Sequence, residues 1–123
     1  DSAYAQRIPY FPITDLLNHT FQINEQDSPE KIKAKIETNL ANLVEDKADI
    51  IPYIGGLLGL NYPEIEEVSP EFWKSKLYGS ILEIFSSLCQ RAPTIICLED
   101  LHRADPSTLE LIQYTFSKLI HPV

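Results

Sequence analysis

Apolar residues recur along much of this chain at the spacing of amphipathic helices. After Asp27-Ser28-Pro29-Glu30, apolar residues follow Ile32 at offsets of 4, 8, 11 and 12 positions, which places them on one helical face. A capping side chain followed by proline marks the start of a helix. The pattern therefore predicts a helix from Pro29 to about Asp46.

The same start signal occurs at Ser69-Pro70-Glu71 and at Asp105-Pro106-Ser107-Thr108. The first predicts a long helix to about Gln90, and the second predicts a last helix that Asp105 caps. Two shorter helices are expected over residues 13–20 and 50–60, the second with a frayed, glycine-rich exit. The predicted buried faces of the two capped helices are Trp73, Leu77, Ile81, Ile84, Phe85 and Leu88, and then Leu109, Ile112, Phe116, Leu119 and Ile120.

One stretch departs from helical spacing. Thr94–Leu98 is continuously apolar and rich in β-branched residues, which predicts a short strand buried on both faces. The predicted fold class is therefore α/β and helix-rich, with one central strand at about 94–98 and four or five helices. A lone strand cannot satisfy its own backbone groups, so its neighbours must come from residues 2–7 or from outside the segment. An exposed strand edge is prone to pair with another chain, which predicts a dimer, a swapped element or a rearranged sheet.

Composition narrows the class of partner. The chain has 123 residues, enough for one domain, and a formal net charge of -8. Such an acidic chain argues against binding nucleic acid or anionic membranes, and no apolar run reaches the length of a membrane span. Cys89 and Cys97 lack metal-ligand spacing, so the chain fits a reducing, cytoplasmic compartment.

The predicted strand ends in two adjacent acids, Glu99 and Asp100. Open α/β sheets bind ligands at the carboxyl ends of their strands. There one acid can hold Mg²⁺ through water while the other orients the water that attacks a phosphate. The alternative is an inert acidic strand end on a helical protein-interaction or scaffold module.

From these acids the chain continues as Glu99-Asp100-Leu101-His102-Arg103-Ala104-Asp105-Pro106-Ser107-Thr108-Leu109-Glu110-Leu111. This segment resembles the Walker B segment of STAND-type AAA ATPases. Those proteins are P-loop NTPases found beside adenylate/guanylate cyclases, serine/threonine kinases and LuxR-type regulators. Upstream, Pro9-Tyr10-Phe11-Pro12 is similar to the segment after their second strand. The resemblance implies that residues 1–123 form one partial domain, from after the P-loop through the Walker B strand and the next helix. It implies that the intact protein binds Mg²⁺ and ATP and switches attached output domains. Glu99 would be the metal-associated acid, Asp100 the acid that positions water, and His102 a nucleotide-site residue.

Two residues depart from that family pattern, and one motif is missing. Glu99 stands where Asp is usual, and Arg103 stands where Trp is usual. A P-loop needs Gly-x-x-x-x-Gly-Lys-Ser/Thr, and residues 55–59 contain glycines without the Lys-Ser/Thr. We therefore expect an internal fragment that carries no bound cofactor and is inactive alone. A third interpretation is a degenerate NTPase that binds nucleotide only structurally.

Overall fold

The computed structural model describes residues 8–91 and 105–120, and nearly all of its regular structure is α-helical. The elements are α2 (Phe11–Thr20), α3 (Pro29–Leu43), α4 (Lys47–Leu57), the short 3₁₀ turn η1 (Pro63–Ile65), α5 (Pro70–Arg91) and α6 (Pro106–Ile120).

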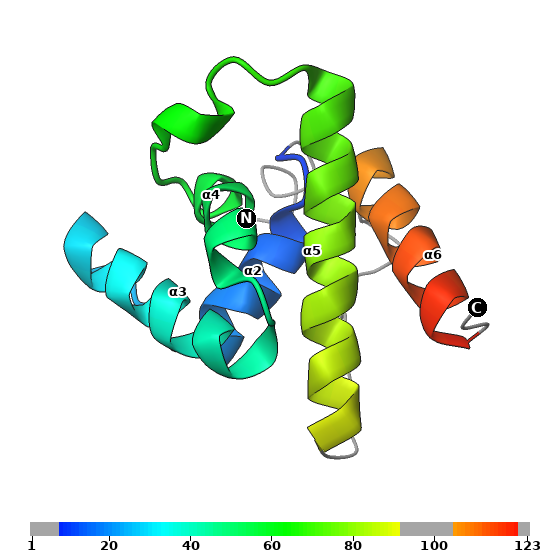
Figure 1. Cartoon of the computed structure of the whole chain (residues 1–123), viewed down its shortest axis with the longest axis horizontal. Helices are drawn as coiled ribbons and strands as arrows, with labels where there is room; N and C mark the ends of the chain where they lie inside the picture. The colour runs from blue at the N-terminus through cyan, green and yellow to red at the C-terminus, as the bar shows by residue number, and fades with distance from the viewer. Residues whose placement is uncertain (1–7, 92–104, 121–123) are drawn as a thin grey trace.

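Helix α5 is the longest element, with 22 residues, and the other helices pack around it (Figure 1). It contacts α3 and α4 on one side and α6 on the other, and α2 contacts α6. The chain that leaves α4 arches through η1 to the upper end of α5 in Figure 1. None of the helices in the described part of the chain combines the length and apolar character that crossing a membrane requires.

Local capping fixes where the helices begin. Ser28 accepts a hydrogen bond from the backbone N–H of Lys31 at 3.1 Å, and Ser69 accepts one from Phe72 at 3.1 Å. Each serine precedes a proline in the first turn, as the sequence predicts. Proline is tolerated there because it lacks only an N–H that would have no helical partner in the first turn. The predicted helix starts at Pro29 and Pro70 are confirmed.

The helix over Pro29–Leu43 is shorter than predicted. Val44 has an extended backbone and ends α3, and the Asp46 side chain accepts a hydrogen bond from the Asp49 N–H at 3.4 Å. Asp46 was predicted as the last residue of one helix and is instead the N-cap of the next. The predicted helix over 50–60 consequently starts earlier, at Lys47, and continues through Pro52.

One core joins the five α-helices of the described residues. Its fully buried side chains, all less than 2% exposed, include Ile13, Leu17, Ile36, Leu40, Ile54, Leu77, Ile81, Ile84 and Leu111. The buried face predicted for α5 is confirmed at its centre, whereas Trp73 and Leu88 are only half-buried. The face predicted for α6 is wrong in part. Leu109 is 39% exposed, and Thr108, Leu111 and Thr115 are buried instead.

The predicted α/β fold class is wrong for the described chain. Residues 8–91 and 105–120 contain no strand and no sheet, so the helices pack on one another rather than on a central strand. The predicted strand Thr94–Leu98 lies outside the described residues. The physical reason for the error is that a short apolar β-branched run does not by itself identify a sheet, and residues 8–91 and 105–120 offer no strand for it to pair with.

Candidate interaction surface

The residues predicted to carry chemistry, Glu99, Asp100 and His102, lie outside the described residues. Their assignment as Mg²⁺, water and nucleotide residues stays a prediction from sequence. Within residues 8–91 and 105–120, no three His, Cys, Asp or Glu side chains converge as a metal site would require.

Asp105, at the end of the same motif, has a structural role. Its carboxylate accepts hydrogen bonds from the Thr108 N–H at 3.1 Å and from the Thr108 hydroxyl at 2.5 Å, which confirms it as the cap of α6. It also accepts a bond from the backbone N–H of Tyr10 at 3.2 Å, 95 residues away in sequence. Asp105 therefore joins the start of α6 to the start of α2.

Tyr10 sits in the left-handed region, with φ 62°, at the N-cap of α2. A non-glycine residue there costs about 1 kcal/mol, which the bond to Asp105 and the packing of the ring offset. The ring centroid of Tyr10 lies 6.1 Å from that of Trp73 and 6.4 Å from that of Tyr78. Tyr10 is thus held as one wall of an aromatic surface at the start of α5.

Two adjacent glycines of α4 let the η1 segment lie directly against that helix. A Cβ added at Gly55 would come within 2.5 Å of Tyr62 Oη and 2.7 Å of its Cζ. A Cβ at Gly56 would come within 2.7 Å of Ile65 Cδ1. Contacts that short force atoms apart, so only glycine permits this approach. The glycines predicted to fray a helix end are instead where η1 packs.

An apolar hollow of about 470 Å³ results between the η1 segment and the first turns of α5. Its walls are mainly aliphatic and aromatic, with one lysine at the edge. The lining residues are Tyr10, Ile65, Val68, Pro70, Trp73 and Lys74. Trp73 is the single tryptophan of the chain and is half-buried here.

Lys74 separates this hollow from a second one of about 420 Å³ between α5 and α6, which Tyr78, Glu110 and Tyr114 help to line. The Lys74 ammonium forms an ion pair with Glu110 and lies 5.6 Å from the centroid of the Tyr78 ring. The hydrogen bond that the Lys74 ammonium donates to the Glu110 carboxylate raises the pKa of Lys74, and the same bond lowers the pKa of Glu110. The Lys74 charge is therefore directed toward α6 and largely compensated there.

Burial has a separate effect on the tyrosines beside these hollows. Desolvation raises the pKa of Tyr62 and, more strongly, that of Tyr78. Both hydroxyls are buried without a hydrogen-bond partner in the described part of the molecule. They remain protonated at neutral pH and act as packing groups rather than as acids or bases.

Four glutamates, the rim glutamates, lie in the chain segment that lines the apolar hollow, and one of them, Glu71, also lines the second hollow. Glu64, Glu66, Glu67 and Glu71 alternate with its lining residues in sequence, and all four are exposed. None of them forms an ion pair with another residue of the described ranges. The segment that supplies part of the apolar lining thus also carries exposed negative charge that no ion pair compensates within the described ranges.

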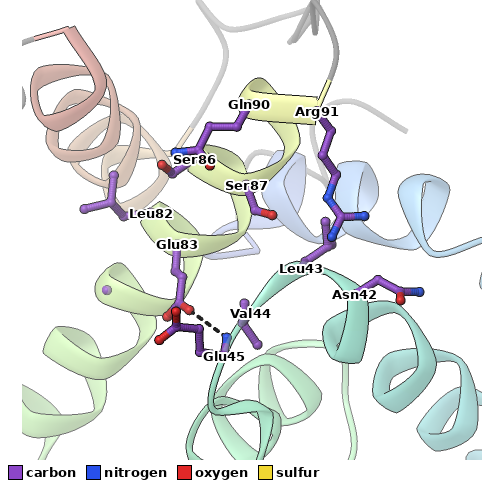
Figure 2. A pocket seen from close by; sticks show the side chains of 11 residues that line it. Asn42, Leu43, Val44, Glu45, Leu82, Glu83, Ser86, Ser87, Gln90 and Arg91 are labelled. Carbon is purple, nitrogen blue, oxygen red and sulfur yellow. Dashed lines mark hydrogen bonds between the residues drawn. The ribbon is translucent and has the colours of Figure 1, made fainter.

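A third hollow, of about 500 Å³, lies between the end of α3 and the second half of α5. Figure 2 shows Glu45 and Glu83 side by side at one edge, where the Glu45 N–H donates to Glu83 Oε2 at 3.2 Å, and Arg91 at the other edge. Most of its lining is polar, including Asn42, Ser86, Ser87 and Gln90. The apolar side chains of its lining are aliphatic only, Leu43, Val44 and Leu82, so it offers less desolvation energy to a partner than the aromatic hollow at Trp73.

Comparison with known proteins shows a distant similarity over part of the chain. No protein-family model matches the chain, and no solved structure matches it. The chain is similar to "Uncharacterized protein R02095" of Rhizobium meliloti (strain 1021), with 27% identity over 73 residues. The match covers 58% of this chain and only 7% of that protein.

The interpretation as a STAND-type, ATP-binding AAA module is therefore wrong. No family model or solved structure supports a P-loop NTPase, and the described chain is helical without a sheet. Part of the motif that suggested it has a simpler cause. Asp105-Pro106-Ser107-Thr108 is a helix-start sequence, which any capped amphipathic helix can share.

Proposed function

We propose that this chain is a helical protein-interaction module that binds its partner in the apolar hollow at Trp73. The supporting observation is the lining of that hollow, in which Tyr10 and Trp73 stand beside Ile65, Val68 and Pro70. Aromatic residues in a desolvated pocket dominate the binding energy of protein interfaces. A hollow of about 470 Å³ has room for one or two apolar side chains of a partner.

The walls are also fixed before a partner arrives. Asp105 holds Tyr10 through its backbone, and the two glycines of α4 set the position of η1. A preformed pocket spares the partner part of the entropic cost of ordering the site. A preformed apolar hollow that includes the single tryptophan thus supports a binding role.

The test uses Trp73 as its own reporter. A random peptide library would be displayed on phage and selected on the immobilised protein, and synthetic versions of the selected peptides would be titrated while tryptophan emission is followed. Since Trp73 is the only tryptophan, a peptide without tryptophan that fills the hollow must change its emission. We expect saturable changes in emission with micromolar affinity.

Two matched variants locate the binding. Val68→Gln places a neutral polar group in the apolar hollow, and Leu82→Gln places the same group, likewise at a half-buried aliphatic residue, in the polar hollow of Figure 2. We expect Val68→Gln to weaken binding about tenfold and Leu82→Gln to leave it unchanged. Circular dichroism melts of both variants check that they fold. The proposal fails if selection yields no saturable binder, or if Leu82→Gln is the variant that loses binding.

A further inference from the structure

We infer that the partner is a basic amphipathic segment, with an apolar side chain in the hollow and Lys or Arg side chains on the glutamate rim; this inference rests on the proposed function. The rim consists of Glu64, Glu66, Glu67 and Glu71, which alternate with the apolar lining residues over eight positions. A partner that follows this segment meets apolar and acidic groups in turn.

The charge of the rim is available to a partner. The four carboxylates are exposed and unpaired within the described ranges. Lys74, the cation at the edge of the hollow, is held by Glu110 and by the face of Tyr78. The nearest positive charge in the lining therefore does not neutralise the rim, and a basic partner gains complementary charge around an apolar contact.

The same charge disfavours other occupants. A second copy of the chain would bring another net charge of -8 to an acidic surface, which opposes self-association. Nucleic acid and anionic lipid carry negative charge, which the rim glutamates repel. An acidic peptide would place like charges together at the rim, which costs free energy.

Three synthetic peptides separate the contribution of charge from that of apolar contact. Each carries the same leucine anchors without tryptophan, and the flanking positions are all Lys, all Gln or all Glu. Trp73 emission is followed at about 20 mM and about 300 mM NaCl. We expect the Lys peptide to bind about tenfold more tightly than the Gln peptide at low salt, with most of that advantage lost at high salt, and the Glu peptide to bind most weakly.

Two charge-matched variants assign the preference to the rim. The rim variant carries Gln at positions 64, 66, 67 and 71, and the control carries Asp15→Asn, Glu25→Gln, Glu30→Gln and Glu45→Gln, all at exposed positions outside the segment that lines the apolar hollow. Both remove four negative charges. The rim variant should lose the preference for the Lys peptide, whereas the control should keep most of it because distant exposed charges are screened.

The possible results distinguish this inference from the proposed function. Equal binding of all three peptides, still sensitive to Val68→Gln, would overturn the basic partner and leave the interaction module intact. If Val68→Gln left the affinity for the Lys peptide unchanged, or if the rim and control variants lowered that affinity equally, the binding would be a general attraction to an acidic protein. Either result would also overturn the inference. Self-association of the protein at the hollow, seen as a concentration-dependent mass that Val68→Gln abolishes, would replace the basic partner with a second copy. Failure of every peptide to bind would overturn both proposals.

Discussion

Substitution of the helical glycines Gly55 and Gly79 by alanine should change stability in opposite directions. Alanine in a helix interior is more favourable than glycine by about 0.5–1 kcal/mol, because the unfolded chain loses conformational freedom. At Gly79, exposed in the middle of α5, an added Cβ meets no atom within 4 Å. Gly79→Ala should therefore raise the free energy of unfolding by about 0.5–1 kcal/mol.

At Gly55 the same Cβ would overlap the Tyr62 ring. Tyr62 is 6% exposed, and contacts of 2.5 and 2.7 Å to its Oη and Cζ are about 1 Å shorter than ordinary van der Waals contact. The ring must move outward and lose part of a burial contribution of about 2–3 kcal/mol. After the helix-propensity gain is subtracted, Gly55→Ala should destabilise the protein by about 1–2 kcal/mol.

Thermal melts followed by circular dichroism measure both effects, since about 1 kcal/mol moves the Tm of a domain this size by about 4 °C or more. A double-mutant cycle identifies the cause. In a Tyr62→Ala background the obstructing ring is gone, so Gly55→Ala should become stabilising by about 0.5–1 kcal/mol. The reasoning is refuted if both alanines shift Tm in the same direction, or if the cost at Gly55 persists without the Tyr62 ring.

Two further predictions concern buried polar groups. The Thr108 hydroxyl donates a hydrogen bond to Asp105, whereas the Thr115 hydroxyl is buried without a partner in the described ranges. In urea unfolding, Thr108→Val should therefore destabilise the protein by about 1–3 kcal/mol, and Thr115→Val should stabilise it by up to about 1 kcal/mol. Equal effects of the two valines would contradict this account. The pKa of Asp27 is lowered, first by the backbone N–H of Asn24 and then by the Lys35 ammonium. The contribution of Asp27 to the free energy of unfolding is therefore present above the ordinary Asp pKa and is lost as pH falls through the lowered value. Asp27→Asn should therefore lower Tm at about pH 7 and make little difference at about pH 2, and a Tm difference that stays constant with pH would oppose this assignment.

The helix starts could be predicted because the interactions that fix them are local. Ser28, Ser69 and Asp105 each cap a helix through a backbone N–H three residues later, so a window of four residues contains the whole signal. The buried face of α6 could not be predicted in the same way. Apolar residues occur on more than one side of that helix, and the bond from Tyr10 to Asp105, over 95 positions, helps to select which side packs inward.

The interaction surface was missed for a related reason. The stretch 61–68 contains several acids, which predicts a solvated loop, and the glycines before it predict a frayed helix end. Only the packing of Tyr62 on Gly55 and of Ile65 on Gly56 shows that this loop is fixed. A usable signal was present in the adjacent glycines of an apolar helix, followed seven and nine residues later by Tyr62 and Ile65.

The segment from Glu64 to Glu71 supplies both the apolar lining and the acidic rim, so its position and its charge can be perturbed separately. Gly55→Ala displaces the segment through Tyr62 and leaves every charge in place. It should weaken the Lys, Gln and Glu peptides by a similar factor in Trp73 titrations, whereas the rim variant should weaken only the Lys peptide. Gly79→Ala, which touches neither, should leave all three affinities unchanged. If Gly55→Ala lowered Tm but altered no affinity, the packing of η1 on α4 would support the fold without shaping the hollow, and binding would have to depend on α5 and Tyr10 alone.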